Sequence, residues 1–298
     1  MNVHQHKIIS ALIVTTITFL GLESLAVIIG LNQLSAFVTT AVYLFLFHVF
    51  WVAFVFDLHL KHTQAVSVTS ARYAALVRSA IIHRFQHFFH WPYVRHFLNY
   101  FILPSVLFWA AVILLYLNPF ASELKQIIAI FSTLTFAAYY WHMKEHLSAN
   151  LEAHHKWLRL LGTTKLFAVY FAFAAILGFS WYYGLGKHIV FYYVLAAAFF
   201  LIHQALFSYG YHRSSLLIVN FVAAVIMGFV GTWVYSNWTY QYFTGALILL
   251  AMYNTVWGFI HHSLDRTFTT KVALEYLVMG ILVVSIIFAT HNFGTRII

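Results

Sequence analysis

The segment from Tyr139 to His155 reads YYWHMKEHLSANLEAHH. It begins as the polar end of an apolar run and continues with a helical pattern, so His142 and His146, four residues apart, share one helix face. Two imidazoles one turn apart can hold one metal ion. A second pair, His154 and His155, follows about two turns later. The segment therefore predicts a helix that carries a metal-binding cluster of histidines.

The rest of the chain has the composition of an integral membrane protein. Of its 298 residues, 63% are hydrophobic and 8% are charged, whereas soluble domains contain about 25% charged residues. Apolar runs follow one another with short connections, which predicts an all-α polytopic membrane bundle that forms a single domain over residues 1–298. We expect no cleavable signal peptide, because residues 8–30 are long enough to span and lack a small-residue cleavage site followed by a polar domain.

Nine apolar runs predict about nine transmembrane helices. They cover approximately residues 8–30, 36–58 and 99–117, a fourth run from 124 into the opening segment, a fifth that ends near 183, and 188–211, 216–235, 240–260 and 271–289. In the seventh run, Gly228 and Gly231 permit the close approach of a neighbouring helix.

Residues 59–98 interrupt the apolar runs with Arg, His and aromatic residues. This mixture predicts an amphipathic segment that lies in the headgroup region of the membrane. Its histidines His83, His87 and His90 follow an i, i+4, i+7 pattern. They are either interfacial residues or further metal ligands.

The Lys and Arg residues predict a cytoplasmic N-terminus. With this orientation, all of the 16 Lys and Arg residues except Lys125, Lys187 and Arg296 fall in cytoplasmic segments, as the positive-inside rule requires. The net charge of +9 is thus a topological signal and does not indicate a nucleic-acid partner. We expect an integral protein of the inner, cytoplasmic membrane.

The same orientation gathers histidines at the cytoplasmic face. His48 and His203 lie deep in the second and sixth runs, where a polar ring within a span marks function. The second, fourth, sixth and eighth runs all end at that face, and their ends carry His59 and His62, His142 and His146, His212, and His261 and His262. The sequence therefore predicts a histidine-lined chamber near the cytoplasmic boundary.

Histidine and carboxylate side chains suit Fe, Zn or Cu rather than Mg or Ca, and the chain has no cysteine to supply a thiolate. Asp265 lies one turn after His261 and is placed to orient its imidazole. Taken singly, a histidine at a helix C-terminus is also an ordinary interfacial residue favoured by the helix dipole. The candidate catalytic carboxylates are Asp265 and Glu145. The candidate metal ligands are His142, His146, His203, His261, His48, His262, His154 and His155.

Three of these stretches carry a resemblance to a known family. They are the spacing of His142 and His146, the aromatic approach FFLIH at Phe199–His203, and YNTVWGFIHHSLD at Tyr253–Asp265. They are similar to motifs of the Brp/Blh membrane beta-carotene dioxygenases, in which histidines from several helices are thought to hold one iron. The early Pro-His-Gly-Ala-x-Asp motif of that family has no counterpart here.

The resemblance implies an enzyme, an iron-dependent oxygenase with one non-haem Fe(II). Its lipophilic substrate would be a carotenoid, taken from the membrane lipid and held in an aromatic tunnel. O2 would cleave a polyene double bond to give a retinal-like aldehyde, with no external electron donor. This is our preferred interpretation.

The spacing of His142 and His146, with His154 and His155 after it, also resembles the histidine boxes of the membrane fatty-acid desaturase and hydroxylase superfamily. That resemblance implies two irons at the cytosolic face and a reductase or ferredoxin as redox partner. The later box of this superfamily has no counterpart, because no histidine lies three or four residues before His261. A di-iron lipid desaturase or hydroxylase is the first alternative.

Two classes other than oxygenases stay open. A membrane cytochrome would use His48 and His203 on facing helices as axial haem ligands and would show an intense visible band. A transporter or structural subunit would use the buried histidines, Glu23 and Asp57 as a proton relay or for packing. Such a protein would carry no stoichiometric metal.

Overall fold

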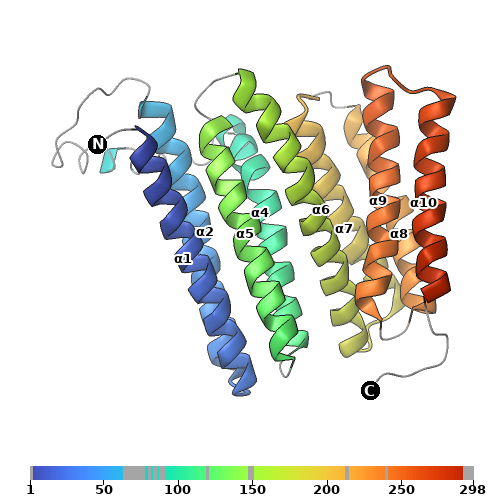
Figure 1. The fold of residues 1–298 in the computed structure, drawn as a ribbon, viewed down its shortest axis with the longest axis horizontal. Coiled ribbons are helices and arrows are strands. Elements are labelled where there is room, and N and C mark those ends of the chain that lie inside the picture. Colours follow the sequence, from blue (N-terminus) through green and yellow to red (C-terminus); the bar gives the residue numbers. More distant parts are fainter. Residues whose placement is uncertain are drawn as a thin grey trace. The chain divides into compact units, whose positions relative to one another are not determined.

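The computed structural model describes residues 3–62, 78–79, 82, 86, 91–118, 121–146, 151–211, 215–238 and 241–290. Within these ranges the regular secondary structure is entirely α-helical, which confirms the all-α prediction. The long helices in Figure 1 are α1 (Val3–Gly30), α2 (Leu34–His62), α4 (Trp91–Leu117), α5 (Ser122–His146), α6 (Leu151–Tyr182), α7 (Lys187–Ser208), α8 (Leu216–Asn237), α9 (Tyr242–Leu264) and α10 (Thr270–Thr290).

Seven of the described helices are long and apolar enough to cross a membrane, which agrees with an integral membrane protein. The segments long and apolar enough to span are Ala11–Gly30, Leu34–Val52, Tyr100–Leu117, Gly162–Tyr182, Lys187–Ser208, Leu216–Asn237 and Tyr242–Leu264. Helices α5 and α10 are not among the seven, and α5 carries Glu123 and Lys125 near its start. The number of nine spans and the cytoplasmic N-terminus stay predictions.

Two helices begin well before the predicted apolar runs. Helix α4 starts at Trp91 rather than near Asn99. Helix α6 starts at Leu151 and includes Lys165, which the sequence predicts to lie in a cytoplasmic segment before the fifth run. Lys, Arg and Leu are good helix formers, so the backbone stays helical after the apolar pattern has stopped. Lys165 is buried within the apolar part of α6.

The predicted amphipathic segment, residues 59–98, overlaps the end of α2 and the start of α4. Residues 59–62 belong to α2 and residues 91–98 to α4. Of the stretch between them, only residues 78, 79, 82 and 86 are described. His83, His87 and His90 lie outside the described residues.

Four helices end with a residue in the left-handed backbone conformation. These residues are Asn32, Gly184, Gly210 and Arg266, with φ of 57°, 60°, 79° and 57°. The amide of the next residue then donates to a carbonyl five positions back, as it does from Tyr211 to Leu206 and from Thr267 to His262. This hydrogen bond defines the Schellman motif. It folds Tyr211 and Thr267 back against the ends of α7 and α9.

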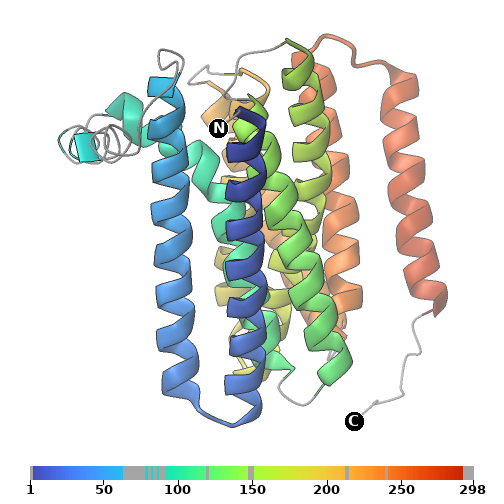
Figure 2. The same ribbon diagram turned by 60° about the vertical axis from the view of Figure 1, so that its left-hand side comes forward.

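The chain forms two compact units, Met1–Lys165 and Leu166–Ile298. In the first unit, α1 packs against α2, α4 and α5, and α4 packs against α2 and α5. Successive helices alternate in direction, so α2 and α5 finish at the same end of this unit (Figures 1 and 2). Gln126 of α5 donates a 2.9 Å hydrogen bond to Glu23 of α1, which gives that acid a polar partner within its span.

The second unit is built from helices that are neighbours in sequence. Helix α7 packs against α8, α8 against α9, and α9 against α10. Helices α7 and α9 finish at the same end of the unit, and α10 stands beside α9 (Figure 1). The prediction of one domain over residues 1–298 stays a prediction.

The close approach of α7 and α8 confirms the role predicted for Gly228 and Gly231. A Cβ atom on Gly231 would lie 2.7, 2.9 and 3.0 Å from three side-chain carbons of Val194, and one on Gly228 would lie 2.8 Å from the Phe191 ring. Neither distance is compatible with an ordinary carbon–carbon contact. The two glycines therefore set the spacing of the helix pair.

Gly231→Ala is expected to destabilise the protein by about 2 kcal/mol. Val194 is β-branched and stiff at χ1 in a helix, so it cannot turn away from the added methyl group. The measurement is unfolding of the detergent-solubilised protein by heat or by added denaturing detergent. Gly162→Ala is the matched control, because a Cβ there meets no atom within 4 Å. A loss of equal size in the control would contradict the packing explanation.

Candidate functional site

The predicted site residues fall into three groups. His48 lies in the first unit, and His203, His261, His262 and Asp265 lie in the second. For the remaining predicted residues the structure describes the helical backbone of α5 and α6 but not the side chains. These residues are His142, Glu145, His146, His154 and His155. Among the described side chains, no three His, Asp or Glu residues converge on one point. The combined chamber therefore stays a prediction.

His261 and Asp265 form the contact that their spacing predicts. Asp265 caps the C-terminus of α9, and its amide donates to the His261 carbonyl at 3.0 Å. This places the Asp265 Oδ2 atom 3.5 Å from the His261 Nε2 atom. A carboxylate held against one ring nitrogen is the arrangement that orients a metal-binding imidazole.

Aromatic rings surround the His261 imidazole. The Trp257 ring lies parallel to it, with ring centroids 5.7 Å apart and an interplanar angle of 7°. The Tyr209 ring is closer, at 4.6 Å, and the Tyr211 ring lies at 6.5 Å. Trp257 comes from the preceding turn of α9, whereas both tyrosines come from the turn that ends α7. These rings restrict the rotation of the imidazole.

The other oxygen of Asp265 accepts a hydrogen bond from the Tyr211 hydroxyl. Burial, followed by this hydrogen bond and the charge of Asp265, raises the pKa of Tyr211. Burial and the charge of Asp265 also raise the pKa of Tyr209. Both phenols therefore stay protonated at neutral pH, and Tyr211 remains a hydrogen-bond donor.

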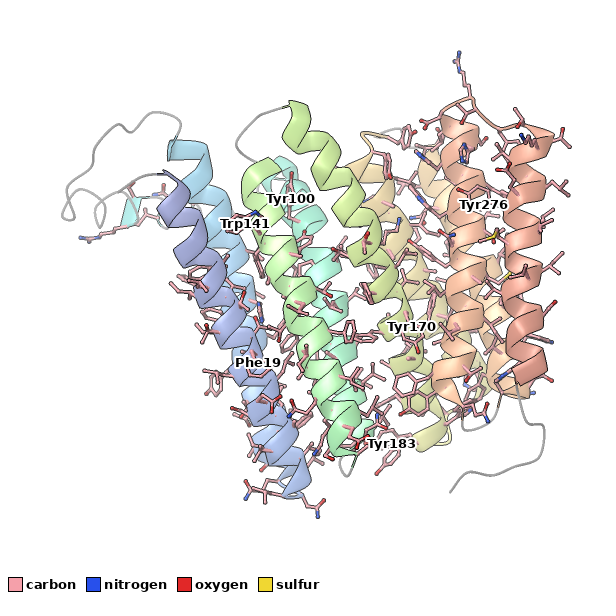
Figure 3. All side chains as sticks on the ribbon, in the orientation of Figure 1. Phe19, Tyr100, Trp141, Tyr170, Tyr183 and Tyr276 are labelled. Atoms are coloured by element: carbon pink, nitrogen blue, oxygen red, sulfur yellow. The ribbon has the colours of Figure 1, made fainter. Side chains whose placement is uncertain are left out.

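His262 is held by the same turn through a different residue. Its Nδ1 atom lies 2.8 Å from the Thr267 hydroxyl, so the Nε2 atom is the one that it presents to a ligand. The ring of Tyr276, labelled on α10 in Figure 3, lies 5.7 Å from the His262 ring. A Cβ atom on Gly258 would overlap that Tyr276 ring. Gly258 thus lets α10 bring Tyr276 close to the histidine pair.

His203 lies in the last third of α7 and is half-buried. Its ring is parallel to that of Phe199, one turn earlier, with centroids 6.2 Å apart and an interplanar angle of 4°. The aromatic approach FFLIH in the sequence therefore builds a stacked pair on one face of the helix. Phe199 and His203 therefore lie on the same side of α7, and their stacking holds the His203 ring in place.

His48 is a buried polar centre of the first unit, with 2% of its surface exposed. Its Nε2 atom lies 3.4 Å from the Thr18 hydroxyl of α1, and its Nδ1 atom lies 3.4 Å from the Tyr140 hydroxyl of α5. The Phe136 ring stacks on it at 4.8 Å, and Phe108 of α4 packs at 5.5 Å. A neutral imidazole has one donor and one acceptor, and each hydroxyl can supply the complement. His48 of α2 therefore contacts α1, α4 and α5.

The sequence patterns did not predict the tyrosines and threonines that contact these histidines. The position of Tyr211 could have been predicted from the sequence. Gly210 follows an apolar helical run, which indicates a left-handed C-cap. The residue after such a cap folds back against the helix. Thr267 occupies the same place after Arg266, but arginine gives no such signal. Thr18 and Tyr140 lie 30 and 92 residues from His48, and no local pattern pairs them.

Comparisons of the chain with known protein families, with curated proteins and with solved structures find no match.

Proposed function

We propose that the chain is a membrane-embedded oxygenase that uses histidine-ligated non-haem Fe(II) and O2 to oxidise a lipophilic substrate. The observation that carries this proposal is the contact between His261 and Asp265, a carboxylate held against an imidazole at a helix end. Most isolated interfacial histidines have no need of such a partner, whereas metal-ligating histidines nearly always have one. The proposed site lies near the cytoplasmic face of the cytoplasmic membrane.

The donor set fits iron. Imidazole and carboxylate groups are suitable ligands for Fe(II), and the chain has no cysteine that would favour a thiolate-bound metal. The preferred ligands are His142, His146, His203 and His261, followed by His48, His262, His154 and His155. When bound, Fe(II) supplies the O2 chemistry, which protein side chains cannot perform by themselves.

In this proposal the described residues of the second unit orient two of the candidate ligands, His261 and His262. Asp265 orients His261 through the Nε2 atom, and Thr267 holds Nδ1 of His262. The rings of Tyr209 and Trp257 pack on His261 and exclude water from that side. The proposed substrate is a carotenoid-like polyene, on the strength of the sequence resemblance. An aromatic surrounding suits such an apolar, conjugated molecule.

A di-iron desaturase or hydroxylase is the second candidate. Helix α5 runs without interruption to His146, so His142 and His146 occupy one helix face, as a histidine box requires. The two candidates differ in electron supply. A carotenoid-cleaving dioxygenase consumes O2 without external electrons, whereas a di-iron enzyme requires a reductase or ferredoxin.

The test is metal analysis of the protein purified in detergent, together with its absorption spectrum. We expect about one iron atom per chain and no Soret band, and aldehyde formation when beta-carotene and O2 are added without a reductant. About two iron atoms, with activity only when a reductant is supplied, would favour the di-iron candidate. An intense Soret band would identify a cytochrome instead. Absence of metal after purification with added Fe(II) would overturn the proposal and favour a transporter or structural subunit.

A further inference from the structure

A side-chain contact joins the ends of α7 and α9 in the second unit. The Tyr211 hydroxyl donates to Asp265 Oδ1, and His261 Nε2 lies 3.5 Å from Asp265 Oδ2. The two carboxylate oxygens therefore face different partners. One partner lies 54 residues upstream, at the end of another helix, and the other lies one turn upstream on α9. Asp265 is thus held from two helices at once.

The backbone at both helix ends fixes these side chains. Gly210, with φ of 79°, ends α7 and directs the Tyr211 amide to the Leu206 carbonyl at 2.9 Å. Asp265 is the C-terminal cap of α9. Each residue therefore sits on a hydrogen-bonded turn rather than on a long loop. Such positions hold a functional geometry more accurately than loops do.

The neighbouring rings keep Tyr211 in the orientation that this hydrogen bond needs. Tyr209 lies parallel to it, with ring centroids 6.4 Å apart and an interplanar angle of 9°. Tyr209 also packs on His261. The raised pKa of Tyr211 keeps its hydroxyl protonated near neutral pH. Tyr211 therefore donates a hydrogen bond to Asp265.

We propose that Tyr211 is a positioning residue of the metal site: its hydroxyl holds Asp265, and Asp265 in turn orients His261 as a ligand. This inference rests on the proposed function, since it requires that His261 binds a metal. Residues that orient a metal ligand change metal affinity by about 10- to 100-fold when they are replaced. Tyr211 acts through Asp265, so its own effect should lie near the lower end, about tenfold.

Co(II) titration of the metal-depleted, full-length protein in detergent tests this inference. Co(II) accepts imidazole ligands, and its visible bands report their geometry. Tyr211→Phe should weaken Co(II) binding about tenfold and shift these bands. Tyr235→Phe is the matched control, because that hydroxyl donates a 2.7 Å hydrogen bond to the Leu185 carbonyl at the other end of the unit. Wild-type affinity in Tyr211→Phe, or an equal loss in the control, would overturn the inference while leaving the proposed function intact.

A double-mutant cycle with Asp265→Asn separates positioning from a general structural effect. If Tyr211 acts through Asp265, then Tyr211→Phe should cause no further loss of Co(II) affinity in the Asp265→Asn protein. Fully additive losses would show that Tyr211 acts by another route and would overturn the inference. Failure of the wild-type protein to bind Co(II) or Fe(II) at all would overturn the proposed function together with it.

Discussion

His261→Ala should lower the iron retained by the purified protein to less than about a tenth of the wild-type content. Removing one imidazole from a site of three or four ligands leaves the ion weakly held. It also leaves Asp265, which lies 3.5 Å from His261 Nε2, without the group that it orients. Elemental analysis of protein purified in parallel measures the effect, and thermal unfolding shows whether the variant remains folded.

His188→Ala is the matched control for this variant. His188 is exposed at the start of α7, at the opposite end of the second unit from His261. The His188→Ala protein should retain the full iron content. By the same reasoning, His142→Ala and His146→Ala should each lose iron, whereas His291→Ala should not. Similar losses in all of these proteins would contradict the proposed metal site.

His48→Ala should destabilise the protein by about 3 kcal/mol. The variant would leave a cavity beneath Phe136 and Phe108, whose rings pack on the imidazole at 4.8 and 5.5 Å. It would also leave the hydroxyls of Thr18 and Tyr140 without the ring nitrogens that face them, and buried polar groups without partners are costly. Denaturing-detergent titration of the purified protein measures the loss.

Two further variants make this prediction specific. Tyr43→Ala removes an aromatic side chain from the same helix, but Tyr43 is 69% exposed, so the change should stay within about 0.5 kcal/mol. Thr18→Val keeps the volume of the side chain and removes only its hydroxyl, which should cost about 1 kcal/mol. An unaltered unfolding midpoint in His48→Ala would show that the imidazole does not hold the four helices together.

Hydropathy was sufficient to predict the helices of this chain but not their full lengths. Helix α8 spans Leu216–Asn237 where the sequence predicts 216–235, because polar residues follow immediately. Helix α4 begins at Trp91, so it includes Arg95 and His96, which lie outside the predicted apolar run. An apolar run indicates which part of a helix lies in lipid. The residues at which the helix ends depend instead on how its terminal backbone N–H and C=O groups are hydrogen-bonded.

The candidate site could be predicted only where its residues are close in sequence. His261 and Asp265 are one turn apart, so the helical period alone brings them together. The contact between Tyr211 and Asp265 depends on how α7 and α9 are placed in the second unit. That placement follows from side-chain packing, such as Gly231 against Val194, which no local pattern reveals.

The different pairing of helices in the two units has a consequence for synthesis of the protein. In the second unit α7, α8 and α9 each pack against the next helix, so each of these pairs can form soon after its second helix leaves the ribosome. In the first unit α1 pairs with α5, and Tyr140 is made 92 residues after His48. At about 5–20 residues per second, this interval lasts on the order of 5 to 20 seconds. During that time the His48 imidazole lacks the Tyr140 hydroxyl that faces its Nδ1 atom in the folded protein.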